Sequence, residues 1–297
     1  AVSDYAQTFD TNALTLDGNS KNIGGSSSDA TISTEGVAVT LVYVDATKGW
    51  IVTDSGLQSD APVPTYIVAT GGTPCAGQTS GNYKYHTFTG PGTFTVCSVG
   101  SLSPNNVVDY LVVAAGGGSG FAQACYQSGG AGGGGGYRES DGTATGCYTV
   151  SPLGTGSCTS ALPVTATGYP IVVGSGGAGS PPTGPTGTQG GTSSFSTKPA
   201  AGGGAGGGWP GHGGTSGGSG GTANSPNSGG AAGGGNTPST TPPQGNTGGT
   251  GQNNPYCAGG SSPHSGGGGG GATGTGTNGA PTGGPGGAGG TSSINAT

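Results

Sequence analysis

Glycine is the feature that most constrains how this chain can fold. It occurs 76 times in 297 residues, and most of these glycines follow Ala115, in runs such as GGAGGGGG and GGGGGGATG. Glycine has no side chain to bury and loses the most backbone entropy on folding, so an ordered glycine-rich segment needs extensive backbone hydrogen bonding. A single conventional hydrophobic core therefore cannot organise the whole chain.

The glycine-rich part has two possible structures, a flexible linker or a packed bundle of polyglycine-II helices. Such helices have three residues per turn and no internal hydrogen bonds, so they must bond to their neighbours. An ordered structure is favoured by an internal sequence similarity, since DYLVVAAGGGSG (109–120) resembles GYPIVVGSGGAG (168–179). It is also favoured by landmarks that linkers lack: Tyr137, Tyr148, Tyr169, Phe195, Trp209, Tyr256 and four of the six cysteines. We therefore expect packed polyglycine-II helices.

The remaining sequence predicts two small β-modules. Residues 1–56 form the first, N-terminally incomplete module, in which GVAVTLVYVDATKGWIVTD predicts two strands around a turn at Lys48-Gly49. Residues 57–65 have the Pro and Ser content of a linker. Residues 66–115 form the second module, with candidate strands YIVAT, YKYHTFT, GTFTVCSV and VVDYLVVAA. The expected fold class is mainly β with little or no α-helix, and residues 116–297 form a glycine-rich region with binding loops.

Charge excludes several kinds of partner. The formal net charge is −6, and Lys198 is the one charged residue after Asp141. Such a surface cannot neutralise phosphates, so we expect no nucleic-acid binding. The sequence also lacks polybasic stretches and long apolar runs, so we expect no membrane insertion.

No catalytic or cofactor site is expected. Gly174, Gly176 and Gly179 spell G-x-G-x-x-G after a strand, but the Ser180-Pro181-Pro182 that follows cannot begin the helix that holds a pyrophosphate. The histidines after residue 200 have no acid nearby in sequence, and the carboxylates lie mostly at turns. We therefore predict a protein that is not an enzyme and has no cofactor or metal.

Six cysteines form an even set without a C-x-x-C pair, which favours disulfides over a metal site. A Cys147–Cys158 bond would close a short loop and is our first choice, and Cys75–Cys97 is the second. Cys125 and Cys257 complete the set of disulfide candidates. Buried unpaired thiols are the alternative, and disulfides would suit a protein that works outside cells.

Aromatic side chains and histidines among Gly, Ser, Pro and Asn are typical of binding loops, since they offer a flat apolar face with a polar edge. The same residues would serve equally well as spacers between glycine layers. The receptor-binding candidates are Tyr126, Tyr137, Trp209, His212, Tyr256 and His264.

Several segments resemble a known family of proteins. LTLDGNSKNIGG, EGVAVTLVYVDATKGWIV, YKYHTFTGPGTFTV, VDYLVVAAGGG and GGGGGYRESDG occur here in this order. They resemble modules of tail-fibre and other virion structural proteins of tailed phages, particularly marine T4-like cyanophages. The resemblance implies a tail-fibre or fibre-tip adhesin, homotrimeric and located on the virion outside the cell. It would bind a host cell-surface glycan or outer-membrane protein, and other virion proteins through a missing N-terminal part.

Two other functions compete with the adhesin. A purely structural fibre or capsid-decoration protein would share the low charge and the repetition. An ice-binding protein would need small residues spaced regularly on one face, and the spacing here is irregular.

Overall fold

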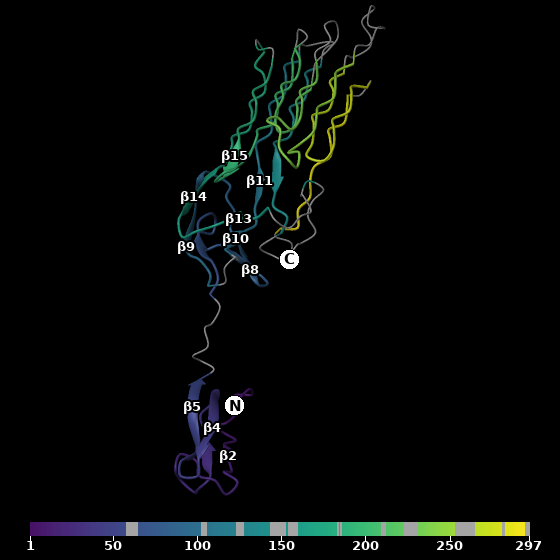
Figure 1. The fold of residues 1–297 in the computed structure, drawn as a ribbon. Helices are drawn as coiled ribbons and strands as arrows, with labels where there is room; N and C mark the ends of the chain where they lie inside the picture. Colours follow the sequence, from purple (N-terminus) through teal and green to yellow (C-terminus); the bar gives the residue numbers. More distant parts are fainter. Residues whose placement is uncertain are drawn as a thin grey trace, which may run out of the picture. The chain divides into compact units, whose positions relative to one another are not determined.

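The structure of the chain, a computed structural model, describes residues 1–57, 65–101, 106–122, 128–142, 153, 160–182, 184, 186–208, 212–222, 231–252, 265–280 and 283–294. Within these residues it contains sixteen short strands and no helix, which confirms the predicted fold class (Figure 1). The chain divides into two compact units, Ala1–Pro64 and Thr65–Thr297.

The first unit is built on the predicted hairpin. β4 (Val37–Asp45) pairs with β5 (Gly49–Leu57), and β1 (Val2–Ser3) pairs with the other edge of β4. The turn falls at the predicted position, where Gly49 has a φ of 68°, a left-handed conformation that side chains disfavour. A second antiparallel pair is formed by β2 (Leu14–Leu16) and β3 (Ala30–Ile32).

Asp4 joins the loops of the first unit. Its carboxylate accepts hydrogen bonds from the amides of Thr8, Phe9 and Gly36, each at 3.0 Å. Burial of this side chain raises its pKa, but the backbone hydrogen bonds from these amides and from Gln7 outweigh burial and leave the pKa lowered. The ionised carboxylate is therefore a structural group.

The second unit contains a five-stranded antiparallel sheet in the order β16–β15–β14–β9–β6. Its strands are β6 (Val68–Thr70), β9 (Gly92–Ser98), β14 (Gly168–Val172), β15 (Ser193–Phe195) and β16 (Lys198–Ala200). The buried core lies against this sheet and contains Ala69, Phe94, Val96, Tyr110, Val112, Ala114, Leu162, Val164, Phe195 and Ala200.

The sheet corrects the predicted domain boundary at residue 115. β14, β15 and β16 come from the glycine-rich region, yet β14 pairs along four residues with β9 of the predicted second module. The two predicted domains are therefore one unit, because the short strands of each complete the other's sheet. Composition alone concealed this, since the strands interrupt the glycine runs only briefly.

Three small pairs complete the strands of this unit. β7 (Gln78–Ser80) and β8 (Tyr83–Tyr85) form a hairpin. β10 (Val107–Val108) pairs with β13 (Leu162–Pro163), and β11 (Leu111–Val113) pairs with β12 (Tyr137–Glu139). β11 and β12 lead directly into and out of the glycine runs.

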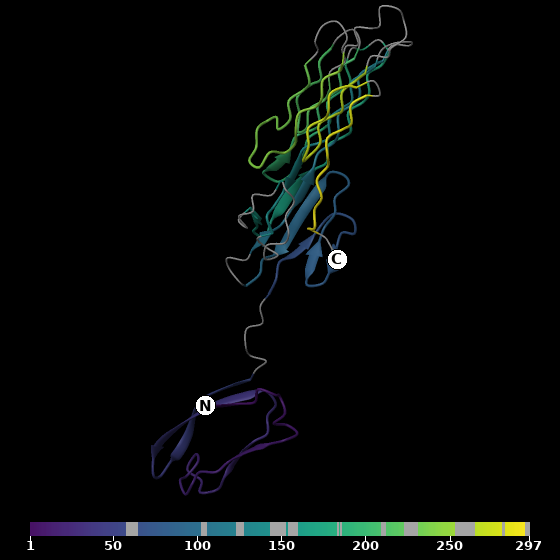
Figure 2. The ribbon, with the colours of Figure 1, turned by 90° about the vertical axis from the view of Figure 1, so that its right-hand side faces the viewer.

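Extended glycine segments run side by side away from the sheet (Figure 2). We call them the glycine bundle: 114–122, 128–136, 174–182, 186–192, 201–208, 212–216, 217–222, 231–235, 244–252, 265–271, 274–280 and 283–290. Their hydrogen bonds recur every third residue. The amides of Ala114, Gly117 and Gly120 donate to the carbonyls of Gly136, Gly133 and Gly130, at 2.8 to 2.9 Å.

The three-residue period carries each segment into contact with several neighbours. The amides of Gly130, Gly133 and Gly136 donate in turn to a third segment, at Gly207, Gly204 and Ala201, at 2.7 to 2.8 Å. A β-strand has a side-chain period of two and bonds to at most two neighbours. A period of three with bonds in several directions is the geometry of packed polyglycine II.

The bundle requires glycine because neighbouring backbones leave no room for side chains. Of the described glycines after residue 115, only Gly142 and Gly283 have positive φ, so most of them adopt backbone conformations open to any residue. A Cβ added at Gly204 or Gly220 would instead meet a neighbouring carbonyl oxygen far closer than van der Waals contact allows. The backbones thus lie where side chains would otherwise be.

Polar side chains add hydrogen bonds to those between the backbones of the bundle. Thr215 Oγ1 accepts from the amide of Ala205 at 2.7 Å, and Ser219 Oγ donates to the carbonyl of Gly271 at 3.1 Å. Ala205 and Ser219 are almost fully buried. The Ser and Thr residues among the glycines therefore act as hydrogen-bonding parts of the bundle.

Candidate binding surface at the distal end of the glycine bundle

Successive segments of the bundle alternate in direction. Residues 114–122 run antiparallel to 128–136, while 201–208 and 217–222 run parallel to 114–122. The described residues that end the segments leading away from the five-stranded sheet, and those that begin the returning segments, therefore lie together at the end remote from that sheet (Figures 1 and 2). We call this the distal end, and it is marked by the described residues Ala122, Ser128, Gly208, His212, Thr222, Ala231, Gln252 and Ser265.

Hydrogen bonds tie the distal end together. The amide of Gly120 donates to Gly130, that of Gly130 to Gly207, and that of Gly207 to Thr222, each at 2.8 Å. Gln252 and Ser265 are paired by an antiparallel bridge. Chain segments that leave and return at these points start from a fixed scaffold.

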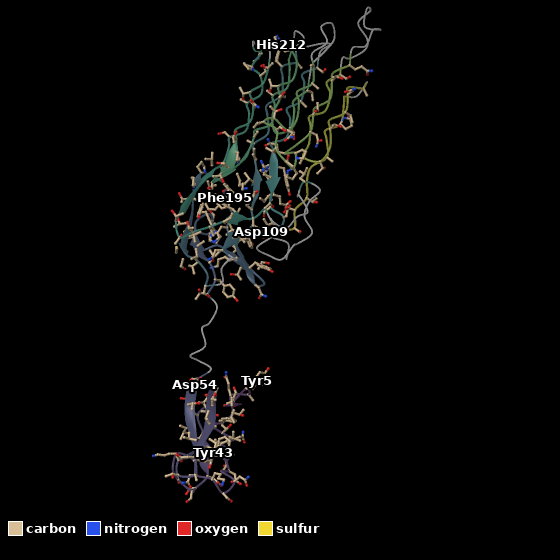
Figure 3. The ribbon with its side chains drawn as sticks, viewed as in Figure 1. Tyr5, Tyr43, Asp54, Asp109, Phe195 and His212 are labelled. Carbon is tan, nitrogen blue, oxygen red and sulfur yellow. The ribbon has the colours of Figure 1, made fainter. Side chains whose placement is uncertain are left out.

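His212 is the predicted receptor-binding residue that the structure places at the distal end. It is exposed, and its amide donates to the carbonyl of Gly208 at 3.0 Å (Figure 3). Four other candidates, Tyr126, Trp209, Tyr256 and His264, lie outside the described residues. Described residues at the distal end flank each of the segments 123–127, 209–211 and 253–264 that hold them.

Tyr137 is in the wrong place for receptor binding. It begins β12 at the opposite end of the bundle and is 6% exposed. Its hydroxyl donates to Glu139 Oε2 at 2.8 Å, and Glu139 also accepts a short hydrogen bond from Ser292. A buried polar network is the physical reason for this aromatic residue, which anchors residues 291–294 to β12.

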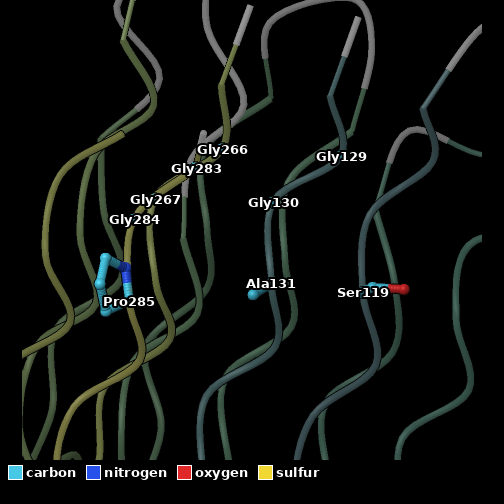
Figure 4. Close-up of a pocket in the computed structure, with 9 residues that line it drawn as sticks. All are labelled: Ser119, Gly129, Gly130, Ala131, Gly266, Gly267, Gly283, Gly284 and Pro285. Carbon is cyan, nitrogen blue, oxygen red and sulfur yellow. The ribbon is translucent and has the colours of Figure 1, made fainter. Parts of the chain in front are cut away.

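A shallow open groove lies near the distal end (Figure 4). Segments far apart in sequence line it: Ser119, Gly129, Gly130, Ala131, Gly266, Gly267, Gly283, Gly284 and Pro285. Ser119 and Ala131 are exposed. The groove offers backbone groups and small side chains, which can contact a ligand by shape and hydrogen bonding.

The segments of the bundle contain no Asp, Glu, Lys or Arg, and Lys198 of β16 is the only such residue after Asp141. Two hydroxyls near the distal end, Ser128 Oγ and Thr222 Oγ1, are buried without a hydrogen-bond partner in the structure. Across the described residues, no group of three His, Cys, Asp or Glu could hold a metal ion. No helix in that part of the chain could span a membrane.

Of the predicted disulfides, the structure describes both cysteines only for the Cys75–Cys97 bond. Cys75 and Cys97 are exposed free thiols, so the structure does not form the predicted bond between them. The Cys97 sulfur instead lies 4.0 Å from Thr70 Oγ1 and 3.9 Å from the carbonyl of Thr95. Cys125, Cys147, Cys158 and Cys257 lie outside the described residues.

Gln244 is a structural residue that sequence reasoning missed. It is 1% exposed, its Oε1 accepts from the amide of Ala201 at 2.7 Å, and its Nε2 donates to the carbonyl of Pro238 at 2.7 Å. A Cβ at Gly136 would collide with this side chain at 2.5 Å. The long side chain thus supplies the acceptor that the amide of Ala201 does not find on a neighbouring backbone. No local sequence pattern predicts that role.

The sequence profile of one protein family, described as a glycine-rich domain, matches residues 89–297. No curated protein matches the chain. No solved structure matches it either.

Proposed function

The chain belongs to the glycine-rich domain family, and we propose that it is a virion tail-fibre or fibre-tip adhesin whose distal end contacts the host cell surface. The observation that carries this proposal is the topology of the bundle. Segments of alternating direction bring exposed His212 to one end, together with the described residues that precede and follow the stretches of sequence containing Tyr126, Trp209, Tyr256 and His264. Binding residues commonly lie on loops that a rigid scaffold positions.

The scaffold suits recognition of a neutral surface group. Its backbone groups are bonded to neighbouring segments, so little entropy would be lost on binding. Its segments carry no charge, which favours contacts through aromatic faces and hydroxyl groups over ion pairing. The partner that fits this chemistry best is a host cell-surface glycan, and an outer-membrane protein is the second choice.

The experiment measures binding of fluorescently labelled full-length chain to host cells. Replacing Trp209 and His212 together by Ala should lower binding at least tenfold and leave the melting temperature unchanged. The matched control is Tyr66→Ala, since Tyr66 is 75% exposed and precedes β6 of the five-stranded sheet. The control should bind like the unaltered chain.

Treatment of the cells separates the possible receptors. Periodate oxidation of surface sugars should abolish binding if the receptor is a glycan, whereas protease treatment should abolish it if the receptor is an outer-membrane protein. No binding by the unaltered chain, or equal binding by the double variant, would favour a purely structural fibre or decoration protein.

A further inference from the structure

The last segment of the glycine bundle, 283–290, has fewer neighbours than the segments inside the bundle. Among the described residues, it exchanges backbone hydrogen bonds only with 265–271 and 273–280. Segment 217–222 exchanges them with six other segments: 128–136, 201–208, 212–216, 231–235, 244–252 and 265–271. The sequence of 283–290, GGPGGAGG, also has no large apolar side chain to bury. A segment with few partners and little apolar burial opens more easily than its surroundings.

Segment 283–290 also forms one side of the groove near the distal end (Figure 4). Its first three residues line the groove together with residues 129–131 and with Gly266 and Gly267. The amide of Gly284 donates to the carbonyl of Gly266 at 2.9 Å, so backbone hydrogen bonding holds this side in place. The groove therefore keeps its shape only while 283–290 stays attached to the bundle.

The chain that follows this segment is fastened to β12 at the opposite end of the bundle. The hydroxyl of Tyr137 lies 2.8 Å from Glu139 Oε2 and 3.3 Å from the carbonyl oxygen of Thr291. The hydroxyl of Ser292 donates a short hydrogen bond to Glu139 Oε1. A Cβ at Gly290 would lie 3.3 Å from the ring of Tyr137, so the backbone packs on that ring. We call this contact the clasp: Tyr137, Glu139, Thr291 and Ser292.

The clasp connects the two segments that border the groove. β12 follows segment 128–136 in the chain, and the clasp residues Thr291 and Ser292 follow segment 283–290. Hydrogen bonds to a carboxylate are stronger than those between neutral backbone groups, and the side chain of Glu139 is buried. Segment 283–290 is thus a weakly held stretch with a strong attachment at one end.

We propose that segment 283–290 is a strap that opens on its own when the clasp is released, while the rest of the bundle stays folded. The closed strap maintains the groove, whereas the open strap removes one side of it and uncovers the carbonyl groups of Gly266 and Gly269. A ligand in the groove would bind the closed form alone and would slow the opening. The clasp thus controls the groove from the other end of the bundle, and this role does not depend on host binding.

The test is hydrogen exchange of the full-length chain, followed by nuclear magnetic resonance at the amides of Gly284 and Gly287. These amides donate to Gly266 and Gly269 in the closed strap. Ser292→Ala and Tyr137→Phe each remove one hydroxyl of the clasp and keep the rest of the side chain. Each should speed exchange at both amides at least about tenfold, because the strap opens more often.

The matched control is Thr291→Ala, because Thr291 is exposed and contributes only its carbonyl to the clasp. Exchange in this variant should equal that of the unaltered chain, and amides of 217–222 should keep their rates in every variant. Unchanged exchange at Gly284 and Gly287 in either clasp variant would overturn the proposal. Equal acceleration across 217–222 would overturn it too, since the bundle would then open as a whole. An effect of Thr291→Ala as large as that of Ser292→Ala would also contradict the clasp.

Discussion

The ring of Phe94 in β9 meets the ring of Phe195 in β15 edge to face, with the centroids 5.7 Å apart. Phe195 also contacts Tyr110 and Tyr169, so one aromatic side chain joins the strands before the glycine-rich region to those within it. The sheet and the glycine bundle therefore depend on a common core. They should behave as one cooperative unit.

Phe195→Ala should destabilise the second unit by about 3–5 kcal/mol, the usual cost of deleting a buried aromatic side chain. Calorimetry should show a single transition of this unit shifting to lower temperature. Val172→Ala in β14 serves as the control, since Val172 is 46% exposed and its loss should have little effect. Two separate transitions for sheet and bundle, with only one displaced, would contradict the common core.

Two glycines of the bundle should respond oppositely to the same substitution. A Cβ at Gly204 would overlap the carbonyl of Thr215, whereas one at Gly176 has no neighbour within 4 Å. Gly204→Ala should cost about 1–3 kcal/mol through overpacking. Gly176→Ala should stabilise by up to about 1 kcal/mol through the entropy of the unfolded chain. Urea unfolding measures both, and equal effects would argue against close packing of the backbones.

Gln244→Leu should destabilise the bundle by about 1–3 kcal/mol, because it keeps the volume of the buried side chain but leaves the partly buried amide of Ala201 without its acceptor. Gln189→Leu is the control, because Gln189 is exposed and donates to the carbonyl of Ser216. Thermal unfolding of both variants measures the difference. A Gln244 variant as stable as the control would remove the structural role assigned to this side chain.

The first unit should lose stability in acid. The folded-state pKa of Asp4 is lowered from its ordinary value of 3.8, so its contribution is complete above that value and is lost as the pH falls through the lower, folded-state pKa. Unfolding of this unit, followed by Trp50 fluorescence, should become easier below about pH 3.8. Asp4→Asn should lessen this dependence, whereas Asp10→Asn, at an exposed position, should retain it. An unchanged acid profile for Asp4→Asn would assign the effect to other carboxylates.

Local patterns predicted much of the fold correctly. Alternating apolar residues predicted β4 and β5. The internal similarity between 109–120 and 168–179 corresponds to β11 and β14, which both lead into glycine segments. Their glycine continuations lie side by side in parallel, with the amide of Gly177 donating to Gly116 and that of Ser180 to Ser119. A strand that leads directly into glycines is a local pattern, so the sequence alone was enough to recognise it.

Contacts between residues far apart in the sequence could not be predicted from local patterns. The pairing of β14 with β9 depends on the whole topology, so the predicted boundary at residue 115 was wrong. Tyr137 was expected on a loop because its neighbours are glycines, but those glycines are packed segments and the ring lies in a buried network. Glycines beside an aromatic residue indicate that its side chain is exposed only where the glycine backbone is itself exposed.

The three-residue spacing of bonds between segments 114–122 and 128–136 sets a rule for how such a chain can change in length. Inserting or deleting three residues in each of two bonded segments preserves which positions face inward. A change of one or two residues would turn Ser, Thr and Ala side chains into spaces that only glycine can occupy. Length variation in the bundle is thus expected in triplets of residues, while the segments joined at the distal end can vary by any number.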